Sequence, residues 1–216
     1  MADASKTGDH SRTPLYDFHI GNGARMVAFA GYEMPVQYPL GILKEHLHTR
    51  SSAGLFDISH MGQLNVTAKS GDLSEAKLAL EALIPVDIES LQPGRQRYGF
   101  FTNENGGILD DLMIANFGDR LVLVVNAANK SADEAHLRAL LPSSITVEKV
   151  DRALIALQGP KSESALARLN SGCTATRFMD VKTLRLLGED CPVSRSGYTG
   201  AVSYTHLTLP TKGSSV

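Results

Sequence analysis

The stretch that most constrains the fold of this chain runs from Asn103 to Met113, because it places two adjacent carboxylates just after a tight turn. Asn105 and Gly106 are an Asn-Gly pair, the strongest short-range signal for a hairpin. The segments on either side, 97–102 and 108–117, are rich in β-branched and aromatic residues, which favour strands. We therefore predict a β-hairpin whose two loop residues are Asn105 and Gly106.

The predicted pairing sends the two adjacent aspartates to opposite faces of the second strand. With this loop, Phe100 lies opposite Asp111, and Tyr98 lies opposite Met113. Because side chains alternate between faces, Asp111 joins Tyr98 and Met113 on a face that suits a flat heterocyclic ligand. Asp110 points to the other, aliphatic face, where we expect it to accept backbone hydrogen bonds. A slip of the loop by one residue would exchange the two aspartates.

The composition is that of an ordinary soluble globular protein. The chain has 216 residues, 43% hydrophobic and 20% charged, which is enough for one large domain or two small ones. A net charge of −2 gives no electrostatic reason to expect nucleic acid or an anionic membrane as a partner. Cys173 and Cys191 lack the spacing of metal ligands, so we expect reduced thiols, no metal site and a cytoplasmic location. No apolar run approaches the ~18 residues of a membrane-spanning helix.

Helical and strand patterns alternate irregularly along the rest of the chain. Residues 1–12 lack a hydrophobic pattern and are predicted to be a disordered tail. Thr13 and Ser131 are expected helix caps, and Asp133 suits the first turn of its helix because of the helix dipole. These patterns predict an α+β fold, with a mixed or antiparallel sheet, hairpins and flanking helices. Helices are expected at 15–19, 41–52, 72–82, 132–141 and 161–169, and strands at 55–68, 120–125, 145–150, 153–157, 184–187 and 193–196, with a short apolar segment at 26–30 that residues 31–35 break.

Seven blocks of sequence resemble, in order and spacing, the aminomethyltransferase family, the T-protein of the glycine cleavage system. The blocks occupy residues 13–16, 29–35, 56–62, 103–112, 124–129, 157–160 and 195–200. The resemblance spans residues 13–200. It implies the incomplete folate-binding region of a larger, multi-domain enzyme.

The resemblance also implies an activity in glycine catabolism and one-carbon metabolism. Members of the family use tetrahydrofolate as co-substrate. They take the aminomethyl group carried on the lipoyl arm of the H-protein, release ammonia, and leave the methylene on tetrahydrofolate. Tetrahydrofolate and the lipoylated H-protein are therefore the expected partners.

The expected site has one catalytic residue and five folate contacts: Asp111, then Met61, Tyr98, Met113, Asn126 and Tyr198. Asp111 matches the family's catalytic aspartate, a carboxylate able to hold a proton and to stabilise developing positive charge. Tyr98, Asn126 and Tyr198 match folate-contacting positions, with Tyr98 stacking on the pterin and Asn126 reading its edge. The two methionines suit a ligand wall, although most such residues fill cores. From the bare pattern alone, Asp111 reads equally as a solvated hairpin acid and Tyr98 as a cross-strand packing residue.

Residues 201–216 do not resemble the family, and we expect them to be a non-native tail. Where the family places a pterin-binding glutamate after Tyr198, this chain has Thr205. We therefore expect the 216-residue chain to bind tetrahydrofolate weakly and to show no measurable transfer. Two other interpretations stay open: a non-catalytic folate-binding relative that supports iron–sulfur cluster assembly, and an inert fragment. The former proteins carry a Lys-Gly-Cys-Tyr block and lack the paired aspartates, whereas this chain has the aspartates and not the block.

Overall fold

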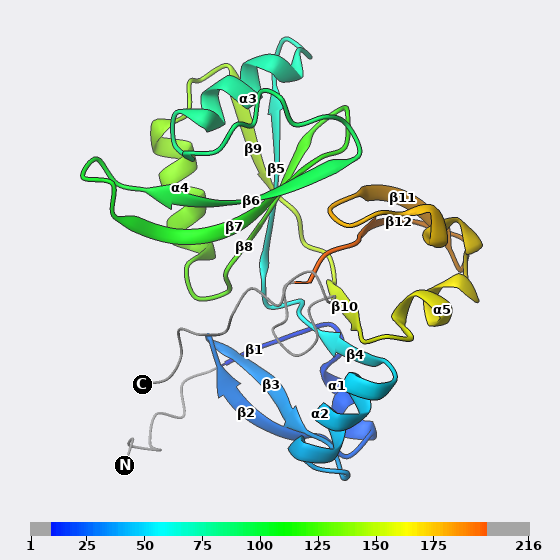
Figure 1. The fold of residues 1–216 in the computed structure, drawn as a ribbon. Coiled ribbons are helices and arrows are strands. Elements are labelled where there is room, and N and C mark those ends of the chain that lie inside the picture. The colour runs from blue at the N-terminus through cyan, green and yellow to red at the C-terminus, as the bar shows by residue number, and fades with distance from the viewer. Residues whose placement is uncertain (1–9, 198–216) are drawn as a thin grey trace.

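A computed structural model describes residues 10–197, whose strands form four separate sheets with helices beside them (Figure 1). The largest sheet has five strands in the order β6-β7-β8-β5-β9, and all its pairings are antiparallel. Its strands are β5 (Gly62–Ala68), β6 (Arg95–Thr102), β7 (Ile108–Asn116), β8 (Leu121–Val125) and β9 (Ile145–Lys149). The predicted α+β class and the predicted hairpin, β6–β7, are confirmed.

The hydrophobic core lies between this sheet and two helices, α3 (Leu73–Glu81) and α4 (Lys130–Leu140), which cover one of its faces (Figure 1). Leu64 and Val66 point into the core, as the alternation in β5 predicts. Leu80 of α3 is fully buried, which stabilises the fold by roughly 1.5–3 kcal/mol. Asp111 of β7 lies on the opposite face of the sheet.

The N-terminal sheet contains a hairpin that the sequence did not predict. It pairs β2 (Arg25–Phe29) with β3 (Tyr32–Gln37) through Ala30 and Gly31, which both have positive φ, 48° and 81°. Alanine rarely adopts a positive φ, so Ala30-Gly31 is not one of the residue pairs that indicate a two-residue hairpin turn. A second difference is β1 (Ser11–Arg12), which pairs with β3 although residues 1–12 were expected to be a tail.

Two helices complete the N-terminal part of the fold, α1 (Tyr16–Gly21) and α2 (Ile42–Ser51). Both were predicted, but the expected apolar face of α2 turns outward, with Leu43 69% and Leu47 56% exposed. The predicted cap of α1 is also wrong. Thr13 Oγ1 does not cap the helix but donates to Asp57 Oδ2 at 2.6 Å.

Asp57 is the centre of a buried network that ties α1 to the strand β4 (Gly54–Asp57). His19 Nε2 donates to Asp57 Oδ2 at 2.9 Å, and His19 Nδ1 lies 2.7 Å from the hydroxyl of Tyr38. Burial acts to raise the pKa of Asp57, but the hydrogen bonds it accepts outweigh burial and leave that pKa below its ordinary value. Asp57 is therefore held as an anion.

Two smaller sheets follow in the C-terminal part of the described chain. They pair β4 with β10 (Ile155–Gln158), and β11 (Val181–Leu186) with β12 (Glu189–Ser194); α5 (Ser162–Ala167) and the short 3₁₀ helix η1 (Ser171–Ala175) lie between them. The Arg95 guanidinium donates to Asp180 and to the Phe178 carbonyl, which fastens the β11–β12 unit to β6.

Some predictions fall outside the described part of the chain. Tyr198 and the segment 201–216 lie there, as do residues 1–9. Within 10–197, no helix has both the length and the apolar character needed to cross a membrane.

The predicted cap of α4 is wrong, because the helix begins at Lys130 and so contains Ser131.

Candidate active site

The β6–β7 loop differs from the predicted two-residue turn. Gly106 N donates to the carbonyl of Asn103 at 2.9 Å, and Asn103 N donates to the carbonyl of Gly107 at 2.9 Å. Asn103 Oδ1 also accepts from the backbone of Asn105 and Gly107, at 3.0 and 2.8 Å. Gly106 has φ +75°, a conformation that glycine adopts without strain. The loop is therefore longer than expected.

A bulge in β7 restores the predicted register despite this longer loop. Thr102 pairs with Ile108 whereas Phe101 pairs with Asp110, so Leu109 has no partner across the hairpin. From that point the pairing is as predicted, with Phe100 opposite Asp111. The longer loop shifts the register by one residue, and the bulge at Leu109 shifts it back.

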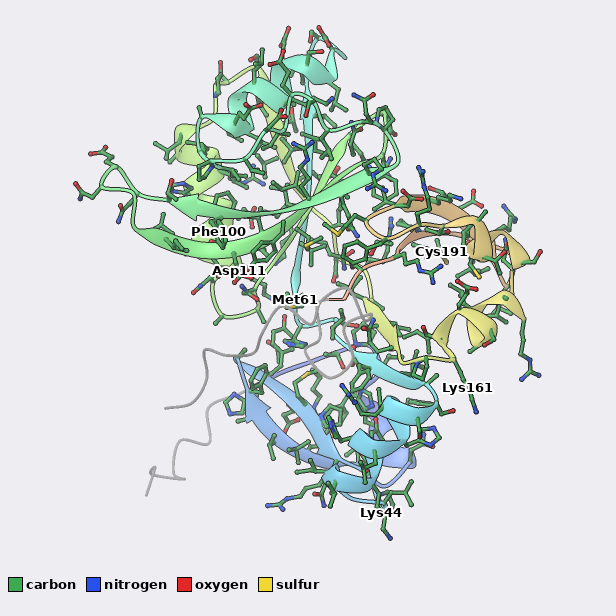
Figure 2. All side chains as sticks on the ribbon, viewed as in Figure 1. Lys44, Met61, Phe100, Asp111, Lys161 and Cys191 are labelled. Carbon is green, nitrogen blue, oxygen red and sulfur yellow. The ribbon has the colours of Figure 1, made fainter. Side chains whose placement is uncertain are left out.

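The two aspartates consequently face opposite sides of the sheet, as predicted. Asp110 is 8% exposed and lies on the helix-covered side, beside the core residues Phe101 and Leu112. Asp111 is half-buried on the other side with Tyr98 and Phe100, and Figure 2 shows Asp111 and Phe100 on this hairpin. Asp110 accepts a hydrogen bond from the side chain of Asn126, not the backbone bonds that we expected.

Asp111 is held by two neutral donors from neighbouring strands. The hydroxyl of Tyr98 donates to Asp111 Oδ2 at 2.7 Å, and Asn126 Nδ2 donates to Asp111 Oδ1 at 2.8 Å. Burial raises the pKa of Tyr98 to about 12, with a contribution from its hydrogen bond to Asp111. Tyr98 therefore remains a hydrogen-bond donor at neutral pH. The structure thus brings together three of the residues expected at the site, Tyr98, Asp111 and Asn126.

Tyr98, Phe100 and Met113 form an apolar surface beside the Asp111 carboxylate. The rings of Tyr98 and Phe100 meet edge to face with their centroids 5.0 Å apart. Tyr98 is 42% exposed, which leaves ring surface open to a ligand. Met113 lies opposite Tyr98 and is only 7% exposed, so it supports this surface from within the fold.

Met61 lies at the end of a neighbouring strand. Gly62 pairs with Val125, so Met61 and Asn126 are the next residues along the same pair of strands. A Cβ at Gly62 would lie 2.6 Å from Val125 Cγ2, which explains the glycine. Met61 also lines a cavity of about 280 Å³, and Figure 2 shows it where the large sheet meets the N-terminal part of the fold. The cavity is lined by Tyr32, Ser59, Met61, Gly62, Gln63, Lys130, Lys149, Val150, Asp151 and Arg152.

Asp133 is a site residue that the sequence reasoning missed. It lies in the first turn of α4, is 4% exposed, and its carboxyl group interacts with that of Asp110. Burial raises the pKa of Asp133 to about 7, helped by the negative charges of Asp110 and Asp111. The sequence did hold a signal for this burial: Asp133 lies four residues before Leu137, so both share one helix face, and Leu137 points into the core.

The arrangement suits acid–base and electrostatic chemistry at a single carboxylate. Asp111 can accept a proton or stabilise a nearby cation, and its two donors keep it fixed in either role. Within residues 10–197, His, Cys, Asp and Glu side chains do not gather in groups of three or more that could hold a metal ion. The fold and site are those of an α+β domain with one oriented carboxylate beside an aromatic surface.

Comparison with known proteins gives the family. The model of the GCVT N-terminal domain matches residues 15–212, and the chain belongs to this family. The aminomethyltransferase of Thermus thermophilus is 40% identical to it over 92% of the chain and 57% of the relative. A mitochondrial aminomethyltransferase of Dictyostelium discoideum is 39% identical, over 96% of the chain and 53% of the relative.

A solved structure agrees with these relatives. The glycine cleavage system aminomethyltransferase T of Bartonella henselae matches with a TM-score of 0.80 and 42% identity, over 88% of the chain and 51% of that protein. The chain thus spans about half the length of the relatives it matches. The family match also continues past Gly200, into the segment that we expected to be a non-native tail.

Proposed function

We propose that this chain is the folate-binding half of a tetrahydrofolate-dependent aminomethyltransferase. The reaction is transfer of the methylene from an aminomethyl group, carried on the lipoyl arm of the H-protein, to tetrahydrofolate with release of ammonia. The family membership and the names of the relatives support this proposal. The observation that carries it is the Asp111 carboxylate, which two neutral donors hold at the edge of an accessible aromatic surface.

Asp111 is proposed as the catalytic residue. Its two oxygens accept from the Tyr98 hydroxyl and the Asn126 amide, so the carboxylate is oriented before any ligand arrives. An oriented anion stabilises positive charge that develops nearby and takes up the proton that a reacting nitrogen loses. Because Asp111 is half-buried, its charge is screened less than that of a fully exposed acid.

The residues beside Asp111 fit a pterin ring. Tetrahydrofolate, when bound, supplies the nitrogen nucleophiles that receive the one-carbon unit. Tyr98 offers an exposed ring face for stacking, Met61 offers an adaptable apolar contact, and Met113 supports the pterin surface from beneath. The amide nitrogen of Asn126 is engaged by two aspartates, which leaves its oxygen to accept from N–H groups of the pterin edge.

The remaining features of the proposed function concern partners and location. The aminomethyl group arrives on a lipoyl group that the H-protein supplies, so the lipoylated H-protein is the proposed protein partner. Cys173 and Cys191 are free thiols, which supports a reducing compartment such as the cytoplasm. Tyr198 remains a proposed pterin contact on the resemblance alone.

The decisive experiment compares Asp111→Asn with Asp110→Asn. Because the chain spans half its relatives, both changes are made in a lengthened chain, in which residues 1–200 precede the C-terminal half of the Bartonella henselae protein. Methylene transfer from aminomethyl-loaded H-protein to tetrahydrofolate is the measured rate. We expect Asp111→Asn to lower it by ~100-fold or more, because a catalytic acid–base group is lost.

The binding of tetrahydrofolate, measured by calorimetry, is the control and should change much less in Asp111→Asn. Equal losses of transfer in the two variants would contradict the assignment of Asp111. Folate binding without any transfer in the unaltered lengthened chain would instead support the non-catalytic, folate-binding interpretation. Absence of both would support the inert fragment.

A further inference from the structure

Two buried carboxyl groups lie behind Asp111, on the helix-covered side of the sheet. Asp110 comes from β7 and Asp133 from the first turn of α4, and the two carboxyl groups interact electrostatically. Each has one oxygen, Oδ2, that is buried and receives no hydrogen bond from the rest of the described chain. The other oxygen of Asp110, Oδ1, accepts from Asn126 Nδ2 at 2.8 Å.

Within residues 10–197, the charged and titratable groups around this pair do not neutralise it. Asp111, on the same strand, adds a further negative charge. The Lys130 ammonium at the start of α4 is directed away, to the Tyr32 hydroxyl at 2.5 Å and the His60 carbonyl at 3.0 Å. His136, one turn further along α4, packs its ring against Phe101 with centroids 5.5 Å apart.

Two carboxylates in contact cannot both stay ionised in such a place. Burying an unpaired charge is costly, and a second like charge in contact adds repulsion. A single proton between the two groups removes the repulsion and leaves one buried charge in place of two, and the protonated carboxyl donates the hydrogen bond that the other oxygen lacks. One hydrogen bond would then give a partner to both Oδ2 atoms, which otherwise have none among the described residues.

We propose that Asp110 and Asp133 share one proton between their Oδ2 atoms, and that Asp133 is thereby a positioning residue for Asp111. The shared proton leaves Asp110 as a hydrogen-bond acceptor, so Asn126 Nδ2 keeps its place between Asp110 Oδ1 and Asp111 Oδ1, both at 2.8 Å. Asn126 in turn orients the Asp111 carboxylate. The presence of the proton is independent of any activity, whereas its effect on catalysis rests on the proposed function.

The direction of the pH dependence follows from the pair. Burial and Asp110 raise the pKa of Asp133 to about 7, against an ordinary value of 3.8. The folded chain therefore holds this proton more tightly than the unfolded chain. The contribution to stability is complete below about pH 4 and is lost as the pH rises through about 7.

The test uses the 216-residue chain with 13C-labelled aspartate, followed by carboxyl-carbon NMR. We expect one carboxyl resonance to titrate with a midpoint near pH 7, and Asp133→Asn to remove it. His136→Gln is the matched control from the same helix and should leave the resonance in place. Urea unfolding from pH 4 to 8 should show a decline in stability for the unaltered chain and a smaller decline for Asp133→Asn.

The positioning role is tested by comparing Asp133→Asn with Asp133→Ala in the transfer assay on the lengthened chain. The asparagine amide can still donate to Asp110, so we expect transfer close to the unaltered rate. Alanine cannot donate, and we expect a loss of about tenfold or more. Rescue by asparagine distinguishes positioning from a direct role of the Asp133 proton in the reaction.

The outcomes separate the two proposals. An Asp133 carboxyl that titrates like a free aspartate, together with parallel stability curves, would overturn the shared proton. Equal transfer in Asp133→Asn and Asp133→Ala, with the titration present, would overturn the positioning role alone. A carboxyl titration near pH 7, combined with full transfer in Asp111→Asn, would refute the proposed catalytic residue while the acid pair stands.

Discussion

At the scale of single residues, three aspartates within one site differ only in what surrounds them. Asp111 accepts from a phenol and an amide on the accessible side of the sheet. Asp110 shares that amide but faces the helices, where it raises the pKa of Asp133. Each neutral donor to an ionised carboxylate contributes ~1.5–3 kcal/mol, enough to fix one rotamer of Asp111. Environment, rather than residue type, therefore assigns the roles.

The two functions of Tyr98, ring contact and hydrogen-bond donor, can be separated by two substitutions. Tyr98→Ala removes both, and we expect tetrahydrofolate binding to weaken by ~1–2 kcal/mol as the stacking contact is lost. Tyr98→Phe keeps the ring, so affinity should be largely retained while transfer falls because Asp111 Oδ2 loses its donor. Calorimetry and the transfer assay on the lengthened chain measure the two effects. Unchanged affinity in a folded Tyr98→Ala variant would reject the pterin contact.

At the scale of elements, local patterns predicted the pairing of one hairpin and failed where the arrangement depends on helix orientation. Parity along β7 separated Asp110 from Asp111, whereas the family resemblance supplied Asn126. Asp133 was read only as a helix-dipole residue, because the side of α4 that faces the sheet is decided by packing. The outward apolar face of α2 was missed for the same reason. Loop length was the other failure, since Leu109 bulges without a recognisable sequence signal.

The hairpin loop gives a prediction about stability. Gly106 has φ +75° and no heavy atom within 4 Å of a Cβ placed on it, so a substitution there is strained but not crowded. Gly106→Ala should lower the free energy of unfolding by about 1 kcal/mol. Gly106→Asn should cost less, because asparagine tolerates this conformation. Urea denaturation measures both changes, and equal losses in the two variants would contradict a purely conformational cost.

At the scale of the whole molecule, polar side chains join segments that lie far apart in the sequence. Lys130 of α4 donates to the hydroxyl of Tyr32 on β3 and to the carbonyl of His60. Asp57 on β4 accepts from Thr13 and His19, and its side chain is completely buried. These contacts hold together segments that lie far apart in sequence, which is why no local pattern predicted them.

The Asp57 network should make the molecule sensitive to acid. The folded-state pKa of Asp57 is lowered, so its stabilisation is present above the ordinary value of 3.8 and is lost as the pH falls through the folded-state pKa. Asp57→Asn should lower stability at pH 7 by ~1–3 kcal/mol and should also reduce the further loss on acidification. Asp190→Asn, at a side chain 66% exposed, is the control. Parallel acid limbs for Asp57→Asn and the unaltered chain, in urea unfolding across pH 2 to 7, would count against this role.

The bulge at Leu109 has a consequence for how the chain tolerates error. If the bulge closed while the loop kept its length, β7 would slip by one position, and Asp110 would take the place of Asp111 opposite Phe100. The accessible face would still carry a carboxylate, because Asp110 and Asp111 are adjacent in the sequence. Asn126 already donates to both side chains, so the donor is in place for either reading. Because Asp110 and Asp111 are adjacent, a one-residue register shift of β7 would still leave an aspartate at the site.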